Sequence, residues 1–364
     1  MSIAIVGGGL AGLSAYATLR HGGLEPGEIT VFGDHADPAA VWRGRAEAIR
    51  QTRMRSESDG HVGPTSFPGL AAREAWRSGS ILPLVESACD RYRPTVGQFL
   101  EHVDATRERS GWDASFVAAR VEELTPVEGG FEVAGRTFAH VLVAPGHPGL
   151  SFPAELAGDA RAVHAYQPHE YADEVEVVGA GMAAATEWLN ALSAGAKVIS
   201  VRRREPERRP LNLPRPLFSR RGLARFHATL PAERAGLLRR FSTPSYPAGR
   251  EWDEPIERAA REGRFRVAAE LNGSPQIVCA TGFRRGYREN TLLRRLVEEH
   301  RVPTAEDWIV LAPDSTVPAL TDESRTLALA GAPAQWAFPA ADTVVGAKYA
   351  ARGFLGRVKA CRTR

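Results

Sequence analysis

The N-terminal segment passes from an apolar run to a glycine-rich turn and then to an amphipathic stretch. Residues 3 to 6 are IAIV, and the following GGGLAG places Gly7, Gly9 and Gly12 in GxGxxG spacing. The next segment, LSAYATLRHGG, has apolar residues at helical spacing and ends on glycines. This order predicts a strand, a tight turn and a helix, with a second strand in ITVF at 29 to 32.

The three glycines of this turn match the needs of a dinucleotide-binding site. Gly7 permits the turn, Gly9 lets a pyrophosphate approach the backbone, and Gly12 allows the helix to pack closely on the strand. The N-terminus of that helix then faces the phosphates. A GxGxxG pattern alone is a weak signal, but its flanking strand and helix are present here. We therefore predict nucleotide binding at the N-terminal unit.

The same unit occurs again later in the chain. The strand EVEVV precedes Gly179, Gly181 and Ala184 in GxGxxA spacing, and an amphipathic helix and the strand KVISV follow. KVISV leads into Arg202 and Arg203, where an NAD site presents a carboxylate and an NADP site presents arginine to the 2′-phosphate. A solvated basic face is the alternative. We predict that this second unit binds NADPH.

The first unit departs from the usual pattern at the end of its second strand. Dinucleotide-binding chains normally place an acidic residue there to hold the adenosine ribose, but this chain has Gly33, followed by Asp34. The loss of one charged hydrogen-bond partner costs roughly 1.5 to 3 kcal/mol, which is small beside the total binding energy of so large a ligand. We expect binding to survive, with Asp34 as the substitute.

Two further apolar strands end in small residues and a glycine. HVLVAPGHPG spans 140 to 149 and QIVCATGFRRG spans 276 to 286, so one follows each nucleotide unit. Near the C-terminus, LALAG predicts a strand that ends at Gly331, and a helix is expected from about Ala340. The N-terminus of that helix could stabilise negative charge on a flavin ring.

The composition is that of a folded chain with real cores. The 364 residues are 43% hydrophobic, which is enough for one large or two ordinary domains. No segment is long and apolar enough to span a bilayer, and no leader precedes the first strand, so we expect a cytoplasmic protein without a membrane partner. Cys89, Cys279 and Cys361 are far apart in the sequence, so we expect no redox pair and no metal site.

Arginine is concentrated in one segment although the net charge is only +3. The segment VRRREPERRPLNLPRPLFSRRG spans 201 to 222 and is either a solvated face or a nucleic-acid patch, but it has no interleaved stacking aromatics. A phosphate-bearing cofactor accounts better for its first arginines. We expect a small-molecule substrate and no nucleic-acid partner. The oligomeric state stays open, with a homodimer as one possibility.

Together these motifs resemble the superfamily of flavoproteins with two dinucleotide-binding domains. The resemblance covers most of the chain and implies an α/β fold with two Rossmann-like domains, the NADPH domain being inserted into the FAD domain. It implies an FAD-binding domain over 1–160 and 318–364. The NADPH-binding domain then spans 161–317, with an insertion at about 205–275. FAD and NADPH are the implied cofactors.

The resemblance also assigns further residues to the cofactors. APGH, ATGF and the C-terminal glycine look like strand-end motifs of this superfamily, which places Gly146, Thr281, Gly282 and Gly331 at the nucleotides. Trp42 is the implied flavin-side tryptophan, although the glycine pair that normally precedes it is here a pair of alanines.

Within this superfamily the chain looks most like the class B flavin monooxygenases. Disulfide reductases carry a cysteine pair that is missing here, and ARAVHAYQPHEY is similar to the monooxygenase stretch before the second glycine motif. The region 202 to 270 resembles the insertion of amine N-hydroxylases. MRSESDGHVGPTSF is loosely similar to their flavin-proximal loop but contains no lysine, so their active-site lysine cannot be carried over.

The implied activity is that of an FAD-dependent, NADPH-reduced monooxygenase acting on a small molecule. The cofactors carry the chemistry and the protein supplies orientation and a dry pocket, so no catalytic residue is assigned. One alternative is an NADPH-dependent flavin reductase that passes electrons to a quinone or a protein. Another is a nucleotide-binding regulatory protein without turnover.

Several side chains have two interpretations. A catalytic role and an ordinary loop position are both open for His61 and His164. A structural turn or a pocket wall is expected from Trp252, Asp253 and Glu254. A flavin-proximal loop is assigned by analogy alone to Ser56, Ser58 and Asp59.

The segment from 205 to 275 interrupts the second unit and is rich in proline and arginine. It has room to fold over the cleft between the two nucleotide sites. We predict that it shapes substrate access, and the aromatic residues expected to matter are Phe218, Phe226, Tyr246 and Trp252. A surface excursion or an oligomer contact is the alternative.

Overall fold

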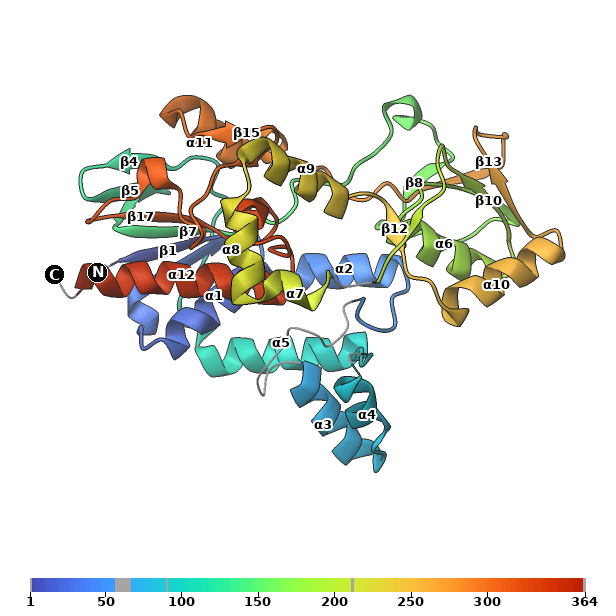
Figure 1. Cartoon of the computed structure of the whole chain (residues 1–364), viewed down its shortest axis with the longest axis horizontal. Helices are drawn as coiled ribbons and strands as arrows, with labels where there is room; N and C mark the ends of the chain where they lie inside the picture. The colour runs from blue at the N-terminus through green and yellow to red at the C-terminus, as the bar shows by residue number, and fades with distance from the viewer. Residues whose placement is uncertain (1, 56–66, 90, 211–212, 363–364) are drawn as a thin grey trace.

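Two parallel β-sheets of five strands each organise the molecule (Figure 1). The computed structural model describes residues 2–55, 67–89, 91–210 and 213–362. The strands of the second sheet all come between β7 and β17 of the first sheet in the sequence. The expected fold class is therefore confirmed: one α/β unit is inserted into another.

The first sheet has the order β17-β7-β1-β2-β3 and is parallel throughout. Its strands are β1 (Ile3–Val6), β2 (Ile29–Gly33), β3 (Phe116–Ala118), β7 (His140–Val143) and β17 (Thr326–Leu329). Every residue of β1, β7 and β17 is buried, as expected of a parallel sheet covered on both faces.

Helices cover one face of this sheet, and a small meander together with further helices covers the other. The first face carries α1 (Leu10–His21), α5 (Val96–Ser110) and α12 (Val344–Arg362), which share a core with the sheet. The second face carries β4 (Thr125–Val127), β5 (Gly130–Val133) and β6 (Arg136–Phe138), an antiparallel sheet whose Phe138 packs edge-on against Phe32 of β2.

The second sheet has the order β13-β10-β9-β14-β8 and is also parallel. Its strands are β8 (Ala162–His164), β9 (Glu174–Val178), β10 (Lys197–Val201), β13 (Phe265–Ala268) and β14 (Gln276–Cys279). α6 (Met182–Ser193) and α10 (Arg250–Arg261) pack on it around the fully buried Trp188.

The insertion does not stay with the second sheet. Its elements are β11 (Glu207–Arg208), α7 (Arg215–Phe218), α8 (Arg220–Ala228), α9 (Pro231–Phe241) and β12 (Ser245–Tyr246). Phe226 of α8 and Leu238 of α9 are buried in the same core as β7 and β17. The same core takes in α11 (Thr291–His300), β15 (Thr304–Ala305) and β16 (Trp308–Ile309). The predicted domain boundary at 317 stays a prediction, but packing on the first unit begins well before it.

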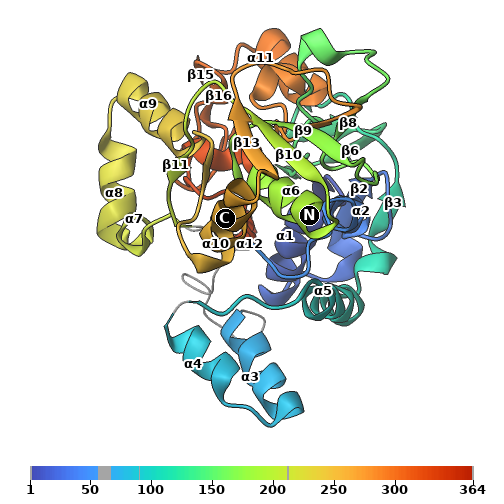
Figure 2. The same cartoon turned by 90° about the vertical axis from the view of Figure 1, so that its right-hand side faces the viewer.

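A pair of helices projects from the rest of the molecule in both views (Figures 1 and 2). It consists of α3 (Phe67–Ser78) and α4 (Leu82–Ala88). Buried Leu70, Ala71 and Tyr92 form a small separate core at its base. None of the helices in the described part of the chain combines the length and apolar composition that a bilayer span requires.

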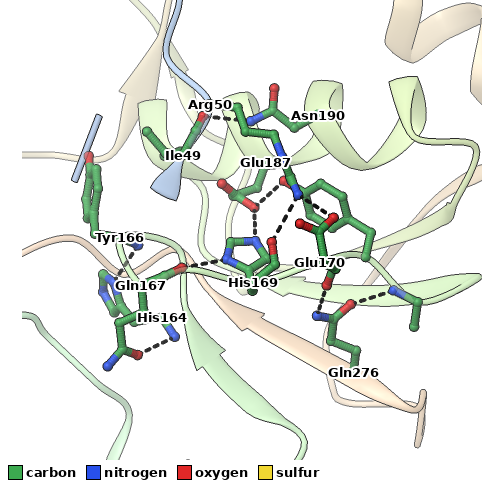
Figure 3. Close-up of polar contacts among 12 residues, drawn as sticks. Ile49, Arg50, His164, Tyr166, Gln167, His169, Glu170, Glu187, Asn190 and Gln276 are labelled. Carbon is green, nitrogen blue, oxygen red and sulfur yellow. Dashed lines mark hydrogen bonds and ion pairs between the residues drawn. The ribbon is translucent and has the colours of Figure 1, made fainter. Parts of the chain in front are cut away.

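Polar contacts join α2 (Ala40–Ala48) and the chain after it to the second unit (Figure 3). The amide of Asn190 on α6 donates to the carbonyl of Ile49 at 2.8 Å. The Arg50 guanidinium donates to the carbonyl of His169 and to Glu170, both at 3.0 Å. Arg55 reaches Thr186 of α6 at 3.0 Å. These bonds fix α6 against the first unit.

A buried carboxylate lies beneath these contacts. One oxygen of Glu187, which is fully buried, accepts hydrogen bonds from His169 at 3.0 Å and from the Tyr171 hydroxyl at 2.8 Å. Burial alone lowers the pKa of His169, but the hydrogen bonds to Glu187 and Gln167 and the charge of Glu187 outweigh it and raise the pKa above its ordinary 6.5. Folding therefore favours the imidazolium.

This pair predicts a pH-dependent stability. A raised folded-state pKa stabilises the fold fully below the unfolded pKa, and the contribution is lost as pH rises through the folded pKa. Glu187→Gln should therefore cost on the order of 3 kcal/mol at pH 6 and clearly less at pH 8, measured by urea unfolding. His102→Gln is the contrast, because burial holds the pKa of His102 at about 4. Only the unfolded imidazole is protonated at pH 6, so this substitution should cost about 0.8 kcal/mol less at pH 6 than at pH 8, which is the opposite trend. An equal cost at pH 6 and pH 8 for Glu187→Gln contradicts the assignment.

Candidate functional site

The first glycine loop is built by close backbone packing at the carboxyl end of β1. Gly7 has a φ of +120°, and a Cβ there would lie 2.1 Å from the carbonyl oxygen of Ala144. A Cβ on Gly12 would lie 2.0 Å from the carbonyl oxygen of Gly7. Neither position can carry a side chain, as the sequence predicted.

Gly9 differs from its two neighbours in the motif. No described atom lies within 4 Å of the Cβ it would carry, and Gly9 is the N-cap of α1 without any side-chain cap. The first amides of α1 thus point into open space in front of the loop, where they can donate to an anion. This loop fits a dinucleotide pyrophosphate.

The structure explains the missing acidic residue at the end of β2. A Cβ on Gly33 would lie 2.7 Å from the Cα and 2.8 Å from the nitrogen of Gly8. The glycine loop therefore rests directly on residue 33. The sequence revealed the departure but not this cause. Asp34 is half exposed, and its carboxylate lies 3.9 Å from Arg120.

The C-terminal glycine brings a third element to this loop. Gly331, with a φ of +72°, lies two residues after β17, and its Cβ would lie 3.4 Å from the Cβ of Ala11 in α1. Trp42 on α2 packs edge-on against Phe99 with ring centroids 5.0 Å apart. Its role toward a flavin stays a prediction, as does that of Asp34 toward the ribose.

The second glycine loop has the same backbone packing as the first, but the space beside its second glycine is occupied by other residues. Gly179 has a φ of +137°, and its Cβ would meet the carbonyl oxygen of Ala280 at 2.5 Å. Ala184 is fully buried against the second sheet. In front of Gly181, however, Pro244 and Ser245 of the insertion lie 3.7 to 3.9 Å from the Cβ position. The insertion thus covers the place that is open at Gly9.

The two predicted phosphate ligands have different surroundings. Arg202 is held by Glu205 at 2.9 Å, its guanidinium lies over the Trp188 ring at 5.5 Å, and its side chain is only 10% exposed. Arg203 is 89% exposed, with Glu155 at 3.8 Å as an ion-pair partner. Arg203 is accessible to a phosphate, whereas Arg202 would first have to leave Glu205.

The segment that covers Gly181 is firmly tied. Glu207 and Ser245 pair in a short parallel ladder. The Arg208 side chain donates to the Tyr246 hydroxyl at 2.8 Å and to the carbonyl of Pro247 at 3.0 Å, and it also pairs with Asp253.

The strand-end motifs form the hinge between the two units. The amide of Ser151 donates to the carbonyl of Gly282 at 2.9 Å, and the Thr281 hydroxyl donates to the carbonyl of Ser151. Gly146, with a φ of +70°, lines a cavity of about 220 Å³ between the hinge and the helical turn Ala332–Trp336. The two motifs therefore meet, and each also packs against a glycine loop, through Ala144 at Gly7 and Ala280 at Gly179.

A larger cavity of about 590 Å³ lies between the insertion and the chain that leads into α12. Its insertion wall includes Leu213, Phe218 and Phe241, and its opposite wall includes Phe338 and Asp342. Of the four aromatic residues proposed for substrate access, Phe218 lines this cavity. The other three are buried in the cores, namely Phe226, Tyr246 and Trp252.

The turn interpretation holds for the start of α10. The Asp253 carboxylate accepts from the backbone amide of Gly249 at 3.0 Å, and Glu254 pairs with Arg250. His164 is fully buried, its Nδ1 accepts from the Tyr166 amide at 3.1 Å, and burial lowers its pKa. It lines neither cavity. Ser56, Ser58, Asp59 and His61 lie outside the described residues.

Two charged residues of the larger cavity were missed by the sequence interpretation. Arg285 lies two residues after the ATGF motif, and Asp342 lies two residues before the first residue of the C-terminal helix. Both stand beside motifs that were recognised, so the only available signal was their position after a strand end. Within the described part of the chain, no group of three or more His, Cys, Asp or Glu side chains is arranged to hold a metal ion.

Comparison with known sequences gives limited information. No family model matches the chain. A methylenetetrahydrofolate–tRNA-(uracil-5-)-methyltransferase, TrmFO, of Anaeromyxobacter sp. (strain Fw109-5) is 33% identical over 162 residues. The match spans 44% of this chain but 31% of that protein.

Comparison with solved structures shows the fold. Ornithine hydroxylase from Pseudomonas aeruginosa has a TM-score of 0.71 at 16% identity, over 98% of this chain and 99% of that chain. Ornithine N-hydroxylase from Kutzneria sp. 744, solved with reduced FAD, NADP+ and L-ornithine, has a TM-score of 0.72 at 14% identity, over 98% of each chain. Bacillithiol disulfide reductase from Bacillus cereus has a TM-score of 0.61 at 13% identity, over 100% and 99% of the chains. The chain has the fold of these proteins.

The packing at Gly33 generates a prediction. Gly33→Ala adds only a Cβ, yet the backbone of Gly8 lies at 2.7 Å from it, so the free energy of unfolding should fall by about 1 to 3 kcal/mol. Gly27→Ala is the control, since no described atom lies within 4 Å of its Cβ. Chemical denaturation measures both variants. If Gly33→Ala is as stable as Gly27→Ala, the loop does not rest on residue 33.

Proposed function

We propose that this protein is an FAD-dependent, NADPH-reduced oxidoreductase that oxygenates a small molecule. The observation that carries the proposal is the first glycine loop, where Gly9 leaves the N-terminus of α1 open to a pyrophosphate. The likeness to ornithine N-hydroxylase structures over nearly the whole chain supports the same reading.

The residues around the first loop fit FAD. Gly7 and Gly12 allow close backbone packing, and Gly9 leaves space for the pyrophosphate. Gly331 places the chain that follows β17 beside α1. Asp34 is the available carboxylate for the ribose. When bound, FAD supplies hydride acceptance and the reaction with oxygen.

The protein chain itself binds and positions the substrate. The larger cavity borders the segment that leads into α12, so a substrate held there lies close to the N-terminus of that helix. The insertion forms one wall, and the opposite wall includes Phe338 and Asp342. This arrangement orients a small molecule and needs no acid or base from the protein.

A second candidate function rests on one observation. Pro244 and Ser245 stand in front of Gly181, where a nucleotide pyrophosphate would approach. If this cover is permanent, the protein binds FAD but is not reduced by NADPH, and it acts as a nucleotide-binding protein without turnover. A flavin reductase remains the third alternative, since its site would have the same two loops.

One experiment separates these functions. The purified protein is saturated with FAD, its visible spectrum is recorded, NADPH is added without oxygen, and oxygen is then readmitted. Bleaching followed by a slow, two-phase return of the flavin bands supports a monooxygenase. Immediate return with stoichiometric hydrogen peroxide supports a reductase. Flavin that binds but does not bleach supports the protein without turnover, and failure to bind FAD contradicts all three.

The first prediction here concerns flavin content. Gly9→Leu should abolish FAD binding because the side chain would occupy the place of the pyrophosphate, while the fold should survive because that place is free of described protein atoms. Flavin absorbance per protein and the circular dichroism spectrum measure the two effects. Gly27→Leu, which also extends into open space, should keep its flavin. Normal flavin content in Gly9→Leu would contradict the site.

The second prediction concerns nucleotide choice. Charge-assisted contacts to a phosphate are worth roughly 1.5 to 3 kcal/mol each, so the protein should prefer NADPH over NADH by about tenfold or more. Arg203→Ala should remove much of this preference without loss of stability, because Arg203 is 89% exposed.

Arg202→Ala is compared with Arg203→Ala, because Arg202 is mostly buried and Arg203 is exposed. It removes the ion pair with Glu205 and the contact with Trp188, so it should lower the melting temperature as well, and the double variant should show almost no preference. The measured quantity is the ratio of kcat/KM for the two nucleotides in anaerobic flavin reduction. Equal values in the unmodified protein would rule out the assignment.

A further inference from the structure

The larger cavity carries an uneven set of charges. The charged residues that line it are Glu207, Arg209, Arg240, Arg285 and Asp342. Their partners within the described chain decide which of them are available to a ligand.

One pair in this set is already neutralised. The carboxylate of Glu207 lies 3.0 Å from the Arg209 guanidinium. Arg209 also donates to the carbonyl of Arg240 at 2.9 Å and to that of Thr243 at 2.5 Å. Arg209 therefore connects parts of the insertion to one another. Because Arg209 and Glu207 neutralise each other, the pair adds no net charge to the cavity.

Arg285 is placed differently. It is exposed, and it lines both cavities, in company with Ser242 and Gln335. Among the described residues no side chain or carbonyl forms a hydrogen bond or a close ion pair with the Arg285 guanidinium, and the same holds for the Arg240 guanidinium. Arg284, the neighbour of Arg285 in the sequence, lines only the smaller cavity, and its guanidinium lies 3.5 Å from the Glu289 carboxylate.

Asp342 is the single carboxylate that opposes these two cations. Even a fully ionised Asp342 leaves the cavity with two free positive charges against one negative charge. The balance of charge in the cavity is positive.

The apolar part of the cavity is flat and aromatic. Phe218 stacks on Phe338 with ring centroids 5.2 Å apart and an interplanar angle of 26°. Phe338 in turn stacks on Tyr349 at 4.6 Å. Phe338 is only 3% exposed, so the ring available to a ligand is that of the partly exposed Phe218, on which a ligand ring can stack. Leu213, Leu238 and Val345 complete the apolar lining.

We propose that the larger cavity binds a substrate with a planar, aromatic body and a single anionic group, which Arg285 holds. The volume of about 590 Å³ is in the range of small-molecule sites. A planar guanidinium suits a carboxylate, to which it donates two parallel hydrogen bonds. The proposal rests on the proposed function, because it names the substrate class of that same site.

The rival is a cationic substrate held by Asp342. It would use one carboxylate against two free arginines, and repulsion from Arg285 and Arg240 would oppose it at every position in the cavity. The two cases differ in the sign of one charge on an otherwise identical ligand, so a matched set of probes separates them.

The test uses three probes of the same shape. 3-Phenylpropionate is the anion, 3-phenylpropylamine the cation and 3-phenylpropan-1-ol the neutral analogue. Binding to the FAD-saturated protein is measured by calorimetry without NADPH, so that nothing turns over. The anion should bind at least about tenfold more tightly than either analogue, the least that one charge-assisted hydrogen bond is worth.

Variants locate the recognition. Arg285→Gln should reduce the affinity for the anion to that for the alcohol and leave the alcohol unchanged. Arg284→Gln is the matched control, and it should leave all three affinities as they are.

Three results overturn the proposal. One is tightest binding of the amine that is lost in Asp342→Asn, another is equal binding of all three probes, and the last is no binding of any probe. Because NADPH is absent, these results are independent of flavin reduction. Failure of NADPH to bleach the flavin would contradict the proposed function while the anion preference could still be present.

Discussion

The close approach of glycine backbones at the carboxyl edge of the first sheet is the constraint on which the molecule depends. Gly12 lies against the carbonyl of Gly7, Gly7 against that of Ala144, and Gly33 against Gly8. These contacts seat α1 on β1 and bring β2 and β7 to the same loop. Because no Cβ fits at any of these points, a single added methyl group would push strand, helix and loop apart together.

The same constraint recurs in the second unit, and the two units differ in what lies in front of the glycine loop. Gly179 and Ala280 repeat the packing of Gly7 and Ala144 almost unchanged, so the second loop has the same shape. What differs is the chain that follows β10. It leaves the second sheet, packs α8 and α9 into the core of the first unit, and returns past Gly181 before α10. The insertion therefore connects the second glycine loop with the larger cavity.

Local sequence was sufficient for the parts of this structure that depend on local contacts. The strands beside the glycine motifs and the two glycine loops follow from apolar runs and glycine spacing, and each is present. The insertion of one unit into the other was implied by the resemblance to a family, and the strand order agrees with it. Partners distant in sequence were not accessible in this way. The residues next to Arg202 in the sequence do not indicate that its guanidinium lies over the Trp188 ring. In the same way, the sequence around Gly8 does not indicate that its backbone leaves no room for a side chain at residue 33. The packing of Phe226 and Leu238 on the first sheet likewise needs the tertiary fold.

The contrast between an open first loop and a covered second loop suits two ligands with different lifetimes on the protein. A cofactor that stays bound gains from a site without competing protein atoms, as at Gly9. A nucleotide that must arrive and leave tolerates a competing segment, because the cover reduces its apparent affinity only by the fraction of molecules that are uncovered. A cover that is open one time in ten weakens binding about tenfold, or roughly 1.4 kcal/mol, which two contacts to a phosphate would offset. The hydrogen bonds from Arg208 to Tyr246 and Pro247 hold the segment that lies in front of Gly181, so the insertion that lines the larger cavity is also the part of the chain that a nucleotide at the second loop would have to displace.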